Sequence, residues 1–309
     1  MSVSIWFWIA FHLGVFAALA IDLGSFHGPH TISLRSAIKR SLIWILLSLA
    51  FNVVIWNRQG TDQAIDFFTG YLIEYSLSVD NIFVFVLIFA YFQVPPEYEH
   101  RVLIWGIVGA VVMRAIMIVL GVTLVARFHF VLYIFGAFLI FTGFRMLIGK
   151  AEQIDLENNF ILRAVRRMLP VTKEYHGPHF LARVDGRTLL TPLALVLIVI
   201  DVMDLVFAVD SIPAVLAITQ DTFIVYTSNV CAVLGLRSLY FLLAHLVSRF
   251  VYLRIGLAVI LCFVGAKMIS SKWVPIPNWI SLLMIATILG VTIVISVLAT
   301  NGQRKPRAR

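Results

Sequence analysis

The sequence is built from apolar runs that are long enough to cross a lipid bilayer. A hydrocarbon core of about 30 Å requires roughly 20 apolar residues in an α-helix, with a range of about 17 to 25. The runs that reach this length lie at roughly 4–23, 41–57, 64–92, 102–125, 128–149, 191–219, 222–247, 250–271 and 278–300. They predict an all-α fold, a polytopic transmembrane helical bundle of about nine spans.

The composition excludes a soluble globule. Hydrophobic residues make up 61% of the chain and charged residues only 13%, so too little polar surface remains to cover a water-exposed fold. The net charge of +8 does not indicate nucleic acid, because the basic residues collect in short connections between the apolar runs. Cys231 and Cys262 lie inside apolar runs and indicate neither a disulfide framework nor a thiolate metal site.

The positions of Lys and Arg predict the orientation. If the N-terminus is outside, the outer connections keep only Arg58, Arg127 and Lys272, and the other connections hold the remaining basic clusters. Basic residues favour the cytoplasmic side of a membrane. We therefore expect a multi-pass protein of the plasma (inner) membrane, with its N-terminus outside and its C-terminus in the cytoplasm.

Two runs carry the same acidic pattern. Segments 74–81 (EYSLSVDN) and 204–211 (DLVFAVDS) each contain an acid, five residues, a second acid and a small polar residue. Matching segments follow at 110–114 and 233–237 (AVVMR and VLGLR), and at 143–146 and 265–268 (GFRM and GAKM). Three spans are thus repeated as three spans. An odd number of spans reverses the second unit in the membrane, so we predict a 3+3 inverted repeat formed by the third to fifth and the sixth to eighth spans.

This repeat divides the chain into five parts. They are two peripheral helices (1–63), the first three-helix repeat (64–149), a cytoplasmic loop (150–190), the second three-helix repeat (191–271), and the last helix with a basic cytoplasmic tail (272–309).

Acids inside these spans are candidate metal ligands. A carboxylate in a membrane-length apolar run usually faces a cavity, a partner charge or an ion pathway. Carboxylate, amide and hydroxyl oxygens suit Mg²⁺, Ca²⁺ or Mn²⁺ better than thiolate-preferring metals. The candidate ligands are Glu74, Asp80, Asp204, Asp210, Asp201, Asp22, Asn81 and Ser211.

Arg114 and Arg237 lie near the middle of spans and are expected to balance charge or to act as gates. The structural alternative is that Arg114 pairs with an acid of the first pattern, and Arg237 with an acid of the second, only to hold helices together.

The two acidic runs also look broken. Each has about 29 residues, or about 43 Å as a straight helix, which exceeds the hydrocarbon thickness. Pro213 cannot donate a hydrogen bond to the carbonyl of Val209, which predicts a break beside Asp210, with a simple kink as the alternative. Residues six apart point about 120° from each other. Two acids would converge only if the helix unwinds between them or if they approach from two helices.

Segments 74–84 (EYSLSVDNIFV) and 204–214 (DLVFAVDSIPA) resemble the two signature segments of the TerC family of integral membrane proteins, and 169–177 (LPVTKEYHG) resembles the loop of its Alx-like manganese exporters. The resemblance covers nearly the whole chain. It implies Mn²⁺ efflux, with tellurite resistance as the older family association. It also implies functional acids at Glu74, Asp80, Asp204 and Asp210, with Asp201 at a further acidic position.

These observations favour a secondary transporter that exports divalent metal ions, first of all Mn²⁺, in exchange for protons that compete for the same carboxylates. Mn²⁺ is then the transported ion, and neither a cofactor nor enzymatic activity is expected. One alternative is a non-transporting membrane component of a tellurite-resistance or metal-delivery complex that docks partners on the 150–190 loop. A hydrolase with two intramembrane aspartates is disfavoured, because four acids in the two repeated patterns fit ion binding better. No sequence motif indicates a particular protein partner.

Overall fold

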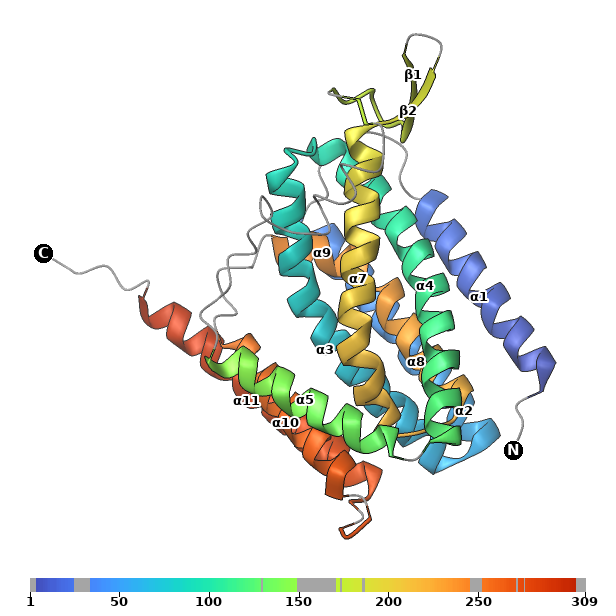
Figure 1. Cartoon of the computed structure of the whole chain (residues 1–309), viewed down its shortest axis with the longest axis vertical. Coiled ribbons are helices and arrows are strands. Elements are labelled where there is room, and N and C mark those ends of the chain that lie inside the picture. The colour runs from blue at the N-terminus through green and yellow to red at the C-terminus, as the bar shows by residue number, and fades with distance from the viewer. Residues whose placement is uncertain are drawn as a thin grey trace, which may run out of the picture.

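Each apolar run of the sequence contains α-helix in the structure, which is a computed structural model (Figure 1). The structure describes residues 4–24, 34–128, 130–148, 171–172, 174–184, 187–244, 252–270, 272–274 and 276–303. The run 222–247 is divided at Gly235 into two helices. In chain order the elements are α1 (Ile5–Gly24), α2 (Leu34–Gln59), α3 (Thr61–Tyr91), α4 (Pro96–Arg127), α5 (Val131–Ile148), β1 (Leu181–Val184), β2 (Arg187–Leu190), α7 (Pro192–Leu216), α8 (Thr222–Leu234), α9 (Leu236–Ala244), α10 (Leu253–Ser270) and α11 (Asn278–Gln303).

The helices have the length and surface of membrane spans. Among the described residues, seven helical segments are long and apolar enough to cross a bilayer, with α8 and α9 counted together, whereas the apolar parts of α1 and α10 are shorter. Large apolar side chains such as Ile116, Leu120 and Leu298 are more than half exposed. Such a surface suits hydrocarbon rather than water. The predicted polytopic helical membrane protein is confirmed.

The three closest helix pairs across the predicted units each join a helix of one unit to a helix of the other. Helix α3 packs along α8, α4 packs along α7, and α5 packs along α10. If α3, α4 and α5 are exchanged for α7, α8 and α10 in that order, the same three pairs result. In Figure 1 the upright helices α3, α4, α7 and α8 form the body of the bundle, and α5, α10 and α11 cross its lower left obliquely. The opposite membrane orientation of the two units stays a prediction.

Glycines bring α5 and α10 into backbone contact. A Cβ atom added to Gly143 would lie 2.5 Å from Sγ of Cys262, and one added to Gly265 would lie 2.6 Å from the carbonyl oxygen of Gly136. No larger side chain fits at these positions. Small residues of this kind let helices approach closely in membranes, where van der Waals packing replaces the hydrophobic effect as the force between them.

The predicted break in the acidic helices is wrong. Helix α3 is continuous over 31 residues and α7 over 25. Pro213 lies in the last turn of α7, where the N–H of Ala217 donates to its carbonyl at 3.0 Å. A proline this close to the end removes one hydrogen bond of a helix that is about to terminate, so the helix continues through it. The interruption lies instead at Gly235, between α8 and α9.

Part of the 150–190 loop forms a hairpin at one end of the bundle, beyond the start of α7 in Figure 1. Strands β1 and β2 pair antiparallel, with Leu181 opposite Leu190. The hydroxyl of Tyr175 donates to the carbonyl of Phe92 at 2.7 Å, and the guanidinium of Arg101 lies 5.5 Å from the ring centroid of Phe180. The segment therefore contacts the bundle where α3 ends and α4 begins. The predicted docking role of the loop includes positions 150–170, which lie outside the described residues.

Candidate functional site: a buried ion-pair network

Arg114 of α4 lies between acids from the two predicted units. Its Nε and Nη2 atoms donate to the two carboxylate oxygens of Asp204 on α7, at 2.9 and 2.8 Å. Its Nη1 atom donates to Oε1 of Glu74 on α3. Bidentate arginine–carboxylate pairs are among the strongest polar contacts in proteins. Glu74 and Asp204 thus converge from two helices, without unwinding of either helix.

Asn229 of α8 closes the network. Its Oδ1 accepts from Nη1 of Arg114 at 3.1 Å, and its Nδ2 donates to Oε2 of Glu74 at 2.9 Å. Glu74 and Asn229 are 0% exposed, Arg114 is 1% exposed and Asp204 is 3% exposed. With all three charged groups ionised, two carboxylates face one guanidinium and the network carries a formal charge of −1. A buried surplus charge is costly and attracts a cation.

Small residues let the four helices approach closely enough to form this network. A Cβ atom at Gly70 would lie 2.9 Å from Oγ of Ser228, one residue before Asn229. A Cβ atom at Gly109 would lie 2.7 Å from Oδ2 of Asp201. Glycine at these two positions brings α3 against α8 and α4 against α7, within reach of the polar side chains.

Asp201 lies one turn before Asp204 on α7. Its carboxylate packs against Gly106 and Gly109 of α4, and its buried Oδ1 has no hydrogen-bond partner among the described residues. A small cavity of about 10 Å³ beside Asp204 extends between α4 and α7, which is close to the volume that one water needs. Asp201 is therefore near the network but outside its hydrogen bonds.

The structure does not bring the other predicted ligands into this network. Asp210 faces α5, where Thr142 Oγ1 donates to its Oδ1 at 3.4 Å. Asn81 and Ser211 are buried, and Oγ of Ser211 has no hydrogen-bond partner among the described residues. The side chains of Asp22 and Asp80 lie outside the described part of the chain.

The two arginines also differ. Arg114 pairs with acids of both patterns, whereas Arg237 is buried at the start of α9, where its charge acts on His100 of α4. Among the side chains that the structure describes, no three His, Cys, Asp or Glu groups cluster closely enough to hold a metal ion.

A second polar network was missed in the sequence. Nζ of Lys267 on α10 donates to Oδ1 of Asn278 at 2.8 Å, and Nδ2 of Asn278 donates to Oδ1 of Asp66 on α3 at 2.5 Å and to the carbonyl of Ile218 at 3.0 Å. The available signal was the position of Asp66 inside the run 64–92 and of Lys267 inside the run 250–271. This network joins α3 to α10 and α11 away from Arg114.

Comparison with known proteins places the chain among bacterial membrane proteins. The family described as "Integral membrane protein TerC family" matches residues 59–305. A Myxococcus xanthus protein named "Uncharacterized membrane protein STKORF319" is 46% identical over 295 residues, which is 95% of this chain and 92% of the relative. A Salmonella typhi protein named "Putative membrane-bound redox modulator Alx" is 44% identical over 312 residues, 98% of this chain and 97% of the relative.

An "Uncharacterized membrane protein" of Rickettsia bellii is 40% identical over 295 residues, 95% of this chain and 98% of the relative. No solved structure matches the chain.

Proposed function

This chain belongs to the TerC family of integral membrane proteins, and we propose that it is a secondary transporter that exports divalent metal ions, first of all Mn²⁺, across the plasma membrane. The observation that carries the proposal is the buried network in which the guanidinium of Arg114 lies between Glu74 and Asp204. The guanidinium of Arg114 shows that the two carboxylates attract a positive charge at this position inside the predicted spans.

Under this proposal a metal ion and Arg114 compete for the same oxygens. The network has a formal charge of −1 with the guanidinium in place. A divalent ion in its stead neutralises both carboxylates, and the side-chain oxygen of Asn229 supplies a neutral ligand. Oxygen ligands of this kind suit Mn²⁺ and exclude metals that prefer thiolates. Arg114 then stabilises the carrier when no metal is bound, so that the unloaded protein holds no unpaired buried acid.

Asp201 extends the proposed path toward the start of α7. Its carboxylate lies one turn from Asp204, and its Oδ1 atom is buried without a hydrogen-bond partner among the described residues. An acid of this kind can take up a metal ion or a proton. Protons and metal ions compete for carboxylates, because the ligands must be deprotonated to bind metal. This competition supports coupling of metal export to proton entry.

The decisive experiment uses the full-length protein in liposomes that enclose a Mn²⁺-sensitive dye. We expect Mn²⁺ flux from the wild type with no partner present, discrimination against Mg²⁺, and loss of flux in Asp204→Asn. The matched control is Asp66→Asn, which removes a membrane carboxylate outside the Arg114 network and should keep most of the flux. Folded, correctly oriented protein that moves no Mn²⁺ would overturn the proposal.

The same preparation tests the scaffold alternative. A non-transporting component would give silent liposomes, and cells would lose metal or tellurite tolerance when Arg163, Arg166 and Arg167 of the loop are neutralised. A transporter should keep its liposome flux in that variant, because these residues lie outside the spans.

A further inference from the structure

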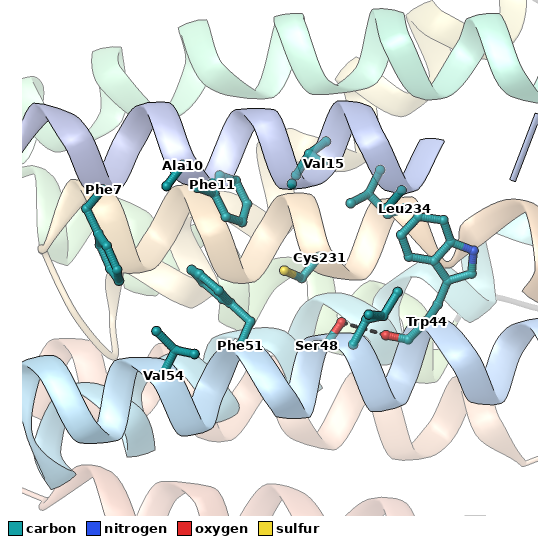
Figure 2. Close-up of a pocket in the computed structure, with 13 residues that line it drawn as sticks. Phe7, Ala10, Phe11, Val15, Trp44, Ser48, Phe51, Val54, Cys231 and Leu234 are labelled. Carbon is teal, nitrogen blue, oxygen red and sulfur yellow. Dashed lines mark hydrogen bonds between the residues drawn. The ribbon is translucent and has the colours of Figure 1, made fainter. Parts of the chain in front are cut away.

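A cavity of about 340 Å³ lies between α1, α2 and α8 (Figure 2). Cys231 and Leu234 of α8 line it, and Cys231 is two residues from Asn229. Two residues correspond to about 200° around a helix. The cavity and the ion-pair network therefore lie on opposite faces of α8, so the cavity is a separate feature from the proposed metal site.

The space exists because α1 presents small residues to it. Ala10, Gly14 and Ala18 line the cavity at a spacing of four residues, and a Cβ atom added to Gly14 would meet nothing within 4 Å. Phe11 and Phe51, which also line the cavity, bridge α1 and α2 along its length, with ring centroids 5.0 Å apart. The lining continues beyond this contact to Phe7 and Val54.

The lining is largely apolar. No charged side chain lines the cavity. The hydroxyl of Ser48 already donates to the carbonyl of Trp44 at 2.9 Å, as the dashed line in Figure 2 shows. The other polar groups of the lining are the indole N–H of Trp44 at one end and the thiol of Cys231, which behaves as a small hydrophobe. The part of any ligand that enters the cavity must therefore be apolar.

The cavity has the depth of one membrane leaflet. Its lining on α2 extends from Trp44 to Val54, which is about 15 Å of helix, or half of the hydrocarbon core of about 30 Å. Leu47 is 48% exposed and Val54 is 42% exposed, so the rim of the cavity belongs to the lipid-facing surface. A lipid acyl chain has the required shape and polarity.

Basic residues lie beyond the Trp44 end of the cavity. Arg40 is one turn before Trp44 on the same face of α2, whereas Arg35 and Lys39, whose side chains are exposed, point about 180° and 140° away from Trp44. Basic residues next to a span attract anionic lipid headgroups. We propose that the cavity binds one acyl chain of an anionic phospholipid, whose phosphate lies at Arg40.

The test is photo-cross-linking in nanodiscs with two lipid probes that carry the same diazirine-labelled acyl chain, phosphatidylglycerol and phosphatidylcholine. In the full-length wild type we expect phosphatidylglycerol to label cavity-lining peptides of α1, α2 and α8 more strongly than phosphatidylcholine does. Arg40→Gln should lower this preference by roughly fivefold. Arg35→Gln, on the opposite face of α2, is the matched control and should leave the preference nearly unchanged.

Filling the cavity provides a second variant. Gly14→Leu places a side chain in the open space and should abolish the labelling. Gly290→Leu is the matched control, because Gly290 lies on α11, outside the cavity, and its added Cβ atom also meets nothing within 4 Å. If Gly14→Leu fails to insert, the comparison of Arg40→Gln with Arg35→Gln still decides the headgroup assignment.

Three results would overturn the proposal. Equal labelling by the two probes would remove the anionic headgroup, and labelling that survives Gly14→Leu would remove the cavity as the binding site. A disulfide between two copies through Gly14→Cys, in a chain with Cys231→Ala and Cys262→Ala, would show a second copy in place of the lipid.

Discussion

The two polar networks inside the bundle hold their charges in different ways. In the central network Arg114 contacts the carboxylates of Glu74 and Asp204 directly, and every member is at least 97% buried. In the network at the end of the bundle, the amide of Asn278 separates Lys267 from Asp66. The first has a surplus negative charge, whereas the second pairs one acid with one base.

Because of this difference, we expect the central network to exchange cations and the end network only to hold helices together. At the centre the two carboxylates share one guanidinium, which a metal ion could replace, and the oxygens around it come from α3, α7 and α8. The end network is neutral when both groups are ionised, and its amide accepts from Lys267 and donates to Asp66 and to the carbonyl of Ile218. Changes to the two networks should therefore differ in both stability and transport.

The largest expected effect is on stability at the centre. Arg114→Ala leaves two buried carboxylates without their cation, and breaking a buried ion pair in this way costs about 3–5 kcal/mol. Lys267→Ala should cost less, about 1–3 kcal/mol, because the group that accepts its hydrogen bond is the neutral amide of Asn278. Chemical unfolding in detergent measures both variants. Equal losses would show that the direct and the amide-mediated networks are equivalent.

The next largest expected effect is on Mn²⁺ transport, which should differ between the two networks. Glu74→Gln and Asp204→Asn each remove a charged oxygen at the proposed metal position, and we expect Mn²⁺ flux to fall by about 10- to 100-fold. Asp66→Asn removes the acid of the other network and should leave the flux near the wild-type value. Liposome flux per folded transporter is the measurement, and a comparable loss in all three variants would place function outside the centre.

A double-mutant cycle sharpens the comparison further. Adding Glu74→Gln to Arg114→Ala should restore part of the lost stability, with a coupling energy of about 0.5–3 kcal/mol, because the two side chains are in contact. Asp66→Asn added to Arg114→Ala should be additive to within about 0.5 kcal/mol. Additivity in the first pair would show that Arg114 and Glu74 do not interact in the membrane.

The smallest effect is expected from the amide at the end of the bundle. Asn278→Ala removes hydrogen bonds to Lys267, Asp66 and Ile218, which should lower the free energy of unfolding by about 1–3 kcal/mol and leave Mn²⁺ flux largely unchanged. Asn229→Ala at the centre should lower both quantities. An Asn278 variant with normal stability and impaired flux would contradict the structural role.

Much of the fold could be predicted because it depends on local properties. Run length and hydropathy are enough to place helices, and all the predicted runs contain them. The position of Pro213 relative to the end of α7 depends on where the chain turns, which the apolar pattern did not define. The proline therefore suggested a break that the structure does not have.

The site was only partly predictable because partners depend on helix faces. The sequence identified Glu74, Asp204 and Arg114, but it assigned one arginine to each repeat. The structure gives both acids to Arg114, since α4 packs along α7 while α3 packs along α8. The network of Asp66 and Lys267 was missed for the same reason, because its members come from spans that are far apart in the chain.

The arrangement of Arg114 also has a consequence for how the chain is made. Forty residues separate it from Glu74 and ninety separate it from Asp204. At roughly 5–20 residues per second of synthesis, Asp204 leaves the ribosome on the order of 5–20 s after Arg114. Glu74 and Arg114 are therefore both synthesised before Asp204, so α7 adds the second acid to a chain in which the first acid and the arginine are already present.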